Sequence, residues 1–521
     1  MERIMKENKV LKSSMIVMIF VIVGKILGIV RDSLIFAKFG TSHSSDIYVW
    51  CFGIVYLFTS LGYGLSTTII PVLTEYIETK DINERNSFVN NVTNTSMLAT
   101  VIITGIGILF SYYIVYYFAN NLSNEPIVFK QTVKILRIMF LSVLFLTLQG
   151  VVAGALQAHK EFSIPSAMAA AANLIYIIYL SLFVDKFGLT GFAITTVLAF
   201  FIQFIINVPK FRKFGYRYKL EVDFKDKDLR KMFILMIPII ISTATMQFNL
   251  FINRSFAIGL YEGAASILDC ANKVTLLTYE VFAVAVSMII YPILSTFIVQ
   301  NNHEEYKKSL VKSINIINIV MIPAALAIVI LREPLISVLY LRGKFTVGNM
   351  KLVSEALVLY SPTMVAYGVR DILNRAFYSA KDTKTPMIYS VVGVVINVVL
   401  SAVLYRHMLV PGLALSSSIS AVVITLMLFF KMNKKFPGIQ FSSMAKTVGK
   451  ISIASIIMGV IIYFMKKIFI INLVSGFVLN LTILFVCAAI GSILYFVLTY
   501  LFKIEETMYV WNIFKSKNSK K

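Results

Sequence analysis

The chain is 521 residues long, 58% of its residues are hydrophobic, only 14% are charged, and its formal net charge is +23. With a mean hydropathy of +0.81, this composition excludes a water-soluble globular protein and indicates a protein that crosses a membrane many times. The positive charge does not indicate a nucleic-acid partner, because the basic residues gather in alternate short loops between apolar runs. Three cysteines inside apolar runs and four scattered histidines predict neither disulfides nor a metal site.

Apolar runs long enough to cross a bilayer as helices occur along the whole chain. We count fourteen, near residues 13–37, 46–74, 92–118, 130–156, 164–184, 190–209, 232–258, 266–294, 313–331, 349–378, 387–405, 412–430, 448–465 and 475–502. The even number places both termini on one side of the membrane. The first run carries charge and lacks a small-residue cleavage pattern, so we expect it to remain in the protein and not to act as a signal peptide.

The loop at residues 210–231 decides which side the termini occupy. It holds nine basic residues and four acidic ones, so the positive-inside rule predicts that this loop is cytoplasmic. Counting outward from it predicts a multi-pass protein of the plasma membrane with both termini in the cytoplasm. Lys466 and Lys467 are an exception to the pattern, because they fall on the outer side.

The sequence repeats itself at an interval of about 221 residues. Residues 153–214 can be laid on 374–435 without gaps, and earlier pairs match at 223: Arg31 with Arg254, Gly40 with Gly263, and Asp46 with Asp269. Six helices per copy predict two lobes in the same orientation, related by a pseudo-two-fold axis along the membrane normal. We predict an N-lobe at 1–220, a C-lobe at 221–445, and two extra helices with a basic tail at 446–521.

Charged residues interrupt the first apolar run. Lys25 lies about 18 Å along a helix that begins near Ser13, too deep for its side chain to reach water easily. Arg31 and Asp32 follow within two turns, and Arg31 is closer to the outer surface. Such cations either pair within the protein, for example Lys25 with Asp32 one heptad later, or face an anion in a cavity.

A second group of charges lies in the run at 266–294. Asp269, Lys273 and Glu280 fall on one face of a helix, and Asp269 and Lys273 have the i, i+4 spacing of a structural ion pair. Because the repeat makes Asp46 the counterpart of Asp269, both copies place an acid at the outer start of a helix.

Four cations in these runs suit an anionic ligand. Arginine can chelate phosphate oxygens in bidentate fashion, and lysine supplies a mobile point charge, so we expect a phosphate or pyrophosphate group in a cavity between the lobes. The cations that we interpret as lining this cavity are Lys25, Arg31, Arg254 and Lys273. The i, i+4 pair of Asp371 and Arg375 has a structural interpretation instead. No constellation of nucleophile, base and metal ligands appears, so we do not expect an enzyme.

The chain resembles the MurJ (MviN) family of lipid II flippases, in the multidrug/oligosaccharidyl-lipid/polysaccharide exporter superfamily. The resemblance covers almost the whole chain and is most specific in GKILGIVRDSLIFAKFGTSHSSD at 24–46, IIPVLTEY at 69–76, LRGKFT at 341–346 and AFYSAKDTKTP at 376–386. It implies an all-α fold of fourteen helices with two six-helix lobes. It also implies movement of undecaprenyl-pyrophosphate-linked disaccharide-pentapeptide from the inner to the outer leaflet, for peptidoglycan synthesis in the bacterial cell wall.

The residues that bind substrate in the family carry over with changes. The resemblance implies this role for Lys25 and Lys273, which replace arginines, and for Arg31, Asp32 and Asp46. Two charges that the family carries later in its second helix are absent among Thr59, Ser60, Gly62 and Gly64. The helix 7 aspartate that some members use for sodium is also absent, since only Asn249 and Asn253 lie there.

We therefore expect a lipid II flippase that works by alternating access without a bound cofactor. The membrane potential can drive export, since moving two negative charges outward releases roughly 4–5 kcal/mol per 100 mV. Sodium or proton coupling stays open, as does association with cell-wall synthesis enzymes. The alternatives are a flippase for another polyprenyl-linked oligosaccharide, such as a capsule or O-antigen unit, a drug or cation antiporter, and a non-transporting membrane scaffold.

Overall fold

The computed structural model describes residues 2–439, 441–469 and 476–508. These residues form helices joined by short connections, and no strand occurs among them. They divide into two compact units. Unit 1 comprises Met1–Ser266 and the short segment Arg342–Phe345, and unit 2 comprises Ile267–Leu341 and Thr346–Lys521. The predicted boundaries of the lobes, at 220 and 445, stay predictions.

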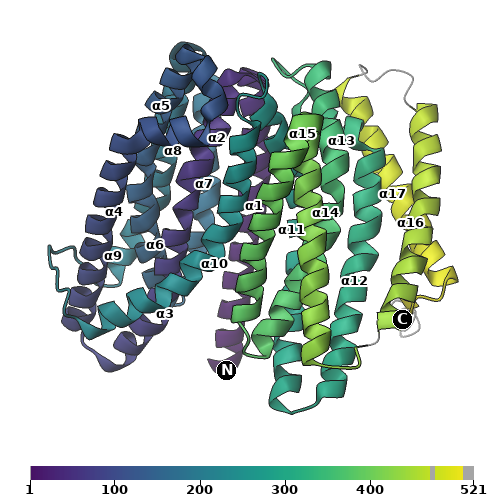
Figure 1. Cartoon of the computed structure of the whole chain (residues 1–521). Helices are drawn as coiled ribbons and strands as arrows, with labels where there is room; N and C mark the ends of the chain where they lie inside the picture. Colours follow the sequence, from purple (N-terminus) through teal and green to yellow (C-terminus); the bar gives the residue numbers. More distant parts are fainter. Residues whose placement is uncertain (1, 440, 470–475, 509–521) are drawn as a thin grey trace. The chain divides into compact units, whose positions relative to one another are not determined.

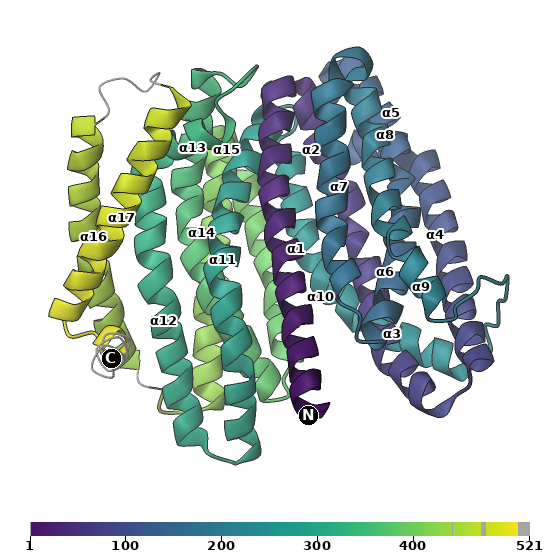
Figure 2. The same cartoon turned by 180° about the vertical axis from the view of Figure 1, so that it is seen from behind.

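The helices of unit 1 run from the N-terminus to residue 257 (Figures 1 and 2). They are α1 (Glu2–Phe39), α2 (His43–Leu57), α3 (Thr59–Thr79), α4 (Ile82–Phe118), the 3₁₀ helix η1 (Asn120–Asn124), α5 (Pro126–Phe140), α6 (Ser142–Ala158), α7 (Ser163–Leu182), α8 (Val184–Ile205), α9 (Val208–Lys213) and α10 (Lys227–Ala257).

The helices of unit 2 follow, and the first of them begins with the last three residues of unit 1. They are α11 (Ala264–Val299), α12 (His303–Ile330), α13 (Arg332–Tyr340), α14 (Val347–Ser379), α15 (Lys384–Lys435), α16 (Phe441–Phe469) and α17 (Phe477–Leu501).

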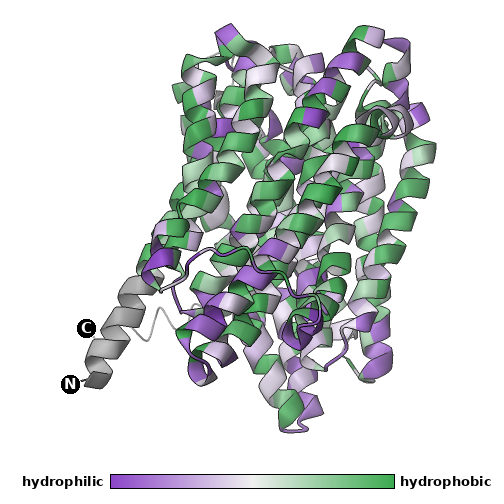
Figure 3. Cartoon of the chain, turned by 90° about the vertical axis from the view of Figure 1, so that its left-hand side faces the viewer, coloured by the Kyte–Doolittle hydropathy of each residue, from purple (hydrophilic) through white to green (hydrophobic). Residues whose placement is uncertain are grey.

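Many of these helices have the length and composition of membrane spans. Among the described residues, eleven helical stretches are long and apolar enough to cross a membrane. Hydrophobic residues cover most of the length of the helices, whereas hydrophilic residues gather mainly at their ends and in the loops (Figure 3). The prediction of an all-α, multi-pass membrane protein is confirmed, while the count of fourteen crossings and the side of the termini stay predictions. Two predicted crossings, 387–405 and 412–430, are joined within α15 at Leu409, where the backbone is not helical (φ 53°, ψ −133°).

The sequence repeat reappears as matching backbone geometry. Gly188, inside α8, has φ 53° and ψ −144°, and it lies 221 residues before Leu409. Lys160 and Lys381, also 221 residues apart, have φ of 60° and 57° in the turns that follow α6 and α14. Left-handed backbone is rare outside glycine, so its recurrence at the predicted interval supports the repeat.

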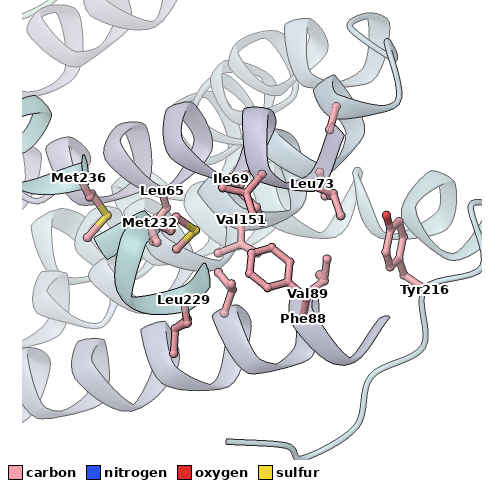
Figure 4. Packing of buried hydrophobic residues seen from close by; sticks show 14 residues of the cluster. Leu65, Ile69, Leu73, Phe88, Val89, Val151, Tyr216, Leu229, Met232 and Met236 are labelled. Carbon is pink, nitrogen blue, oxygen red and sulfur yellow. The ribbon is translucent and has the colours of Figure 1, made fainter. Parts of the chain in front are cut away.

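The hydrophobic core of unit 1 lies where α3, α4, α6 and α10 meet (Figure 4). Ile69, Phe88, Val151 and Met232, one from each helix, belong to this buried cluster. Beside it the backbones of α3 and α6 touch, because a Cβ atom on Gly62 would lie 2.5 Å from the carbonyl oxygen of Leu146. This stretch of α3 therefore has no room at Gly62 for the charged side chains that the family carries nearby.

The basic loop of unit 1 is fixed to α4 by asparagines. The Nδ2 group of Asn94 donates to the carbonyl oxygens of Lys219 and Glu221, at 2.8 and 2.9 Å. Asn91 accepts a hydrogen bond from the backbone amide of Asp223 and donates one to its carbonyl. The loop thus has a defined path, because its backbone groups are satisfied by side chains of a membrane helix.

The last two helices of unit 2 pack against α12 and α13. Buried Met458 and Ile462 of α16 and Cys487 of α17 share a hydrophobic cluster with residues of α12. Lys466 forms an ion pair with Glu333 of α13 at 2.9 Å and also donates to the carbonyl oxygen of Ile330. This partner accounts for one of the two lysines that depart from the positive-inside pattern.

Candidate functional site

Arg31 is the best-defined of the predicted cations. Its Nε and Nη2 atoms donate to Oδ1 of the neighbouring Asp32 at 3.0 and 2.9 Å, and its Nη1 atom donates to Oδ1 of Asn173 at 3.0 Å. The Arg31 side chain is 22% exposed and that of Asp32 is 13% exposed. These three bonds use three of the five N–H donors of a guanidinium, so two donors remain for a ligand. The partner of Asp32 is therefore Arg31, and this ion pair lies on one helix.

The close packing of α1 against α7 places Asn173 beside Arg31 (Figure 2). Gly24 and Gly28 of α1 are spaced as G-x-x-x-G, and a Cβ atom on Gly28 would lie 3.3 Å from Nδ2 of Asn173. Nδ2 of Asn173 donates to the carbonyl oxygen of Gly24 at 2.9 Å, which leaves its Oδ1 to accept from Arg31. Small residues allow such helices to approach closely in a membrane. The glycine pair thus determines where the arginine is held.

An aromatic wall borders the same arginine. The Arg31 guanidinium lies 5.5 Å from the centre of the Tyr176 ring on α7, within the range of a cation–π interaction. The rings of Tyr176 and Tyr48 each pack on Phe192 of α8, with centres 5.6 and 4.4 Å away. The group is thus a cation held by a carboxylate, an amide and an aromatic face, an arrangement that can orient an anion. Sequence reasoning missed Asn173 and Tyr176, although the G-x-x-x-G spacing was a signal for the helix contact.

Asp46 has a local structural role. Its carboxylate accepts hydrogen bonds from the backbone amides of Gly263 and Ser266, both at 2.8 Å, and from the Ser266 hydroxyl at 2.7 Å. These donors are the orphan groups at the start of α11, so buried Asp46 caps that helix from a distant part of the sequence. Substrate contact by Asp46 stays a prediction.

The other predicted cations lie in different surroundings. Lys25, on α1, is exposed. Arg254 packs on α2, where a Cβ atom on Gly53 would lie 2.8 Å from its Nη1 atom. In unit 2, Lys273 forms the predicted i, i+4 ion pair with Asp269 at 2.9 Å. The Asp269 side chain is only 2% exposed, so this pair has the structural role considered for it, and a role for Lys273 in binding substrate stays a prediction.

Two further predicted features lie outside this group. Nε of Arg375 lies 3.8 Å from the carboxylate of Asp371, within the distance of an ion pair. In the LRGKFT segment, the backbone amide of Lys344 donates to the carbonyl oxygen of Ala37, and the buried Phe345 ring packs edge-on against Phe36. The segment therefore packs on the end of α1, as its architectural interpretation predicts. Within the part of the chain that the structure describes, no group of acidic residues, histidines and cysteines is placed to hold a metal.

Comparison with known proteins extends these observations. The sequence profile of the family described as "Lipid II flippase MurJ" matches residues 35–484 of this chain. The chain belongs to the MurJ family. Curated MurJ relatives include a "Probable lipid II flippase MurJ" of Vibrio cholerae, 28% identical over 80% of this chain and 81% of that protein. A protein with the same description from Bdellovibrio bacteriovorus is 26% identical over 96% of each chain.

Solved structures show the same fold. A structure described as "Lipid II flippase MurJ, inward closed conformation" matches with a TM-score of 0.78 and 24% identity, over 94% of this chain and 98% of the other. A multidrug resistance transporter of the MATE family in an inward-facing conformation matches with a TM-score of 0.66 and 15% identity, over 81% of this chain and 96% of the other. The expected superfamily fold is confirmed. As a MurJ family member the chain is a transporter and not an enzyme.

Proposed function

We propose that this chain moves lipid II, the undecaprenyl-pyrophosphate-linked peptidoglycan precursor, from the inner to the outer leaflet of a bacterial cytoplasmic membrane. The observation that carries the proposal is the match to the MurJ family over residues 35–484. The Arg31 group adds chemistry that suits the substrate, because its guanidinium keeps two N–H donors and is already oriented by Asn173.

In this proposal the pyrophosphate docks first on Arg31. Its guanidinium is held by three hydrogen bonds, so little side-chain entropy is lost when an anion arrives. Asp32 offsets part of the positive charge, which keeps binding weak enough for release on the far side. Lys25, Arg254 and Lys273 are proposed as further cations for the same head group. The membrane potential favours outward movement of the two negative charges.

Replacement of Arg31 tests the proposal. In a bacterium depleted of its own lipid II flippase, the wild-type chain should restore growth and the exposure of lipid II on the outer leaflet. Arg31→Ala should reduce the exposure rate at least tenfold, because a charge-assisted hydrogen bond contributes about 1.5–3 kcal/mol. Arg31→Lys should retain part of the activity, since it keeps the charge and loses the fork. Arg212→Ala, in the exposed basic loop, is the matched control and should behave as wild type.

A second candidate is a flippase for another polyprenyl-linked oligosaccharide. The observation that favours it is the tight contact of Gly62 with α6, which leaves no space for the charges of the family's second helix. If the inserted wild-type chain fails to restore growth in the depleted strain yet exposes a capsule or O-antigen precursor, this candidate replaces lipid II.

We also propose that both termini are cytoplasmic, as the basic loop at 210–231 suggests. Single cysteines introduced near each terminus of a cysteine-free variant should react with a membrane-impermeant maleimide only after the cells are opened. Reaction at either end in intact cells would contradict this orientation.

A further inference from the structure

A cavity of about 620 Å³ lies in unit 2 where the first turns of α12 and α16 approach the segment that follows α17. The proposed function gives these residues no role. Six lysines line the cavity: Lys307, Lys308, Lys312, Lys446, Lys450 and Lys503. Three glutamates line it with them: Glu304, Glu505 and Glu506. Lysines thus outnumber acids in the lining, and the predicted topology places this end of the helices in the cytoplasm.

Several of these charges are already engaged. Lys307 pairs with Glu304 at 2.5 Å, and Lys308 pairs with Glu305 at 2.9 Å. Glu506 accepts a hydrogen bond from the side-chain amide of Asn315 at 2.8 Å. These contacts leave the charge of the remaining lysines to be explained.

Three lysines keep their charge available. Within the described part of the chain, Lys446, Lys450 and Lys503 form no ion pair, and all three are exposed. Lys446 and Lys450 lie one turn apart near the start of α16, where the helix dipole adds partial positive charge. Lys503 has a fixed backbone (φ 51°), because its amide donates to the carbonyl of Tyr500 at the end of α17. Three cations from two segments therefore converge on one cavity.

The wall of the cavity also carries a polar group without a partner. Asn315 of α12 lines the cavity and is only 5% exposed. Its Nδ2 group donates to Glu506, but its Oδ1 atom has no hydrogen-bond donor in the described structure. A buried acceptor without a donor is costly, so a ligand hydroxyl at this wall would remove a penalty. A phosphate that carries hydroxyl groups satisfies both the lysines and the asparagine.

The surface next to the cavity favours a lipid as the source of that phosphate. One turn beyond Lys450, the face of α16 is apolar and exposed, with Ile453 at 54%, Ile456 at 56% and Val460 at 49% exposure. Acyl chains can lie along such a face, whereas a soluble phosphate gains nothing from it. We propose that this cavity binds the head group of an anionic phospholipid with a hydroxylated head, such as phosphatidylglycerol. Its phosphate lies among Lys446, Lys450 and Lys503, and its acyl chains lie along α16.

The test measures lipid binding by the full-length protein in detergent. Phosphatidylglycerol is titrated against the wild type and the triple variant Lys446→Gln, Lys450→Gln, Lys503→Gln, and binding is followed as the rise in melting temperature. The affinity of the triple variant should fall on the order of a hundredfold, from about fivefold for each lysine near a membrane surface. The matched control is Arg212→Gln, Lys213→Gln, Lys225→Gln, which removes the same charge from the exposed loop of unit 1 and should retain wild-type affinity.

Two further arms identify the source of the phosphate. Phosphatidylcholine, which has no net charge, and glycerol 3-phosphate, which has no acyl chain, should each leave the melting temperature of the wild type unchanged. Equal affinity of the triple variant and the control for phosphatidylglycerol would overturn the site. Lysine-dependent stabilisation by glycerol 3-phosphate alone would overturn the lipid. Because the readout is binding and not flipping, neither outcome depends on whether the proposed function is correct.

Discussion

The turn that follows α6 in unit 1 and the turn that follows α14 in unit 2 have the same backbone and different side-chain partners. In each turn a lysine adopts left-handed backbone, and the next residue is acidic. The amide of that acid donates to the carbonyl five residues back, at 2.9 Å in both turns: Glu161 to Leu156, and Asp382 to Phe377. This is the hydrogen-bond pattern of a Schellman helix end, reproduced at an interval of 221 residues.

The two acids reach different bases. Glu161 pairs with Lys210 of α9 at 3.3 Å, whereas Asp382 pairs with Lys435 at the end of α15, at 2.9 Å. The repeat counterpart of Lys210 is Lys431, so the pair in unit 2 has moved by one helical turn. The shorter Asp382 side chain also accepts from the amide and hydroxyl of Thr385, as a cap for α15. The comparison teaches that the repeat preserves the backbone of the turn and lets its ion pair move.

The kinks at Gly188 and Leu409 offer the strongest test of this conservation of backbone. Both have φ 53°, but leucine is strained there and glycine is not. Gly188→Leu should destabilise the protein by about 1–3 kcal/mol, and Leu409→Gly should stabilise it by about 1 kcal/mol after the entropy cost of glycine. Melting temperatures of the purified variants in detergent measure both effects. If both substitutions destabilise the protein, the two kinks are not equivalent.

Removing each acid tests the part of the turn that differs. Glu161→Gln should weaken one ion pair by about 0.5–1 kcal/mol, because its partner is partly exposed. Asp382→Asn should cost more, since it disturbs both an ion pair and a helix cap. Hydrogen exchange of the Ser163 and Thr385 amides reports each turn separately. A larger effect in unit 1 would contradict the order expected here.

The same acids predict how stability depends on acid pH. Burial opposes ionisation of Glu161 and of Asp382, but hydrogen bonds from their lysine partners and neighbouring amides hold the pKa of each below its ordinary value. Their contribution to stability is therefore complete above the unfolded pKa, about 4, and is lost as the pH falls through the folded value. The difference in melting temperature between the wild type and the double variant Glu161→Gln, Asp382→Asn should shrink in that range. A constant difference would exclude the depressed pKa values.

The smallest expected effect separates the units near neutral pH. His159 precedes the turn of unit 1, with its Nε2 atom 2.9 Å from the Tyr216 hydroxyl, and its counterpart in unit 2 is Ala380. Burial lowers the pKa of His159, and the charge of Arg85 lowers it further. The folded state thus favours neutral histidine, so stability falls as the pH drops below the unfolded value, about 6.5. Between pH 7.5 and 5.5, hydrogen exchange should accelerate in the turn of unit 1 more than in that of unit 2, and His159→Gln should abolish the difference.

The sequence predicted features that depend on local spacing. Apolar runs predicted the helices, and the 221-residue interval predicted turns that the structure repeats down to the φ of Lys160 and Lys381. The i, i+4 pair of Asp269 and Lys273 was also predicted, because one helix turn places both side chains on one face. Such features need no knowledge of which helices meet.

The features that escaped prediction depend on contacts between distant segments. Asn173 meets Arg31 across 142 residues, and Asp46 meets Ser266 across 220. Neither pairing leaves a periodic signal in the sequence, because one buried hydrogen bond fixes only one residue on each helix. The missing charges near Gly62 were visible in the sequence, but their cause, the contact of α3 with α6, required the fold.

The segment Arg342–Phe345 completes unit 1 although the chain on both sides of it belongs to unit 2. Lys344 and Phe345 pack on the end of α1, about 300 residues upstream. A ribosome makes α1 first, at about 5–20 residues per second, so the end of this helix lacks its partner for on the order of half a minute. Asp46 waits in the same way for the start of α11. The oldest helix of the chain is thus among the last to be finished, and a membrane chaperone or insertase would find its target there.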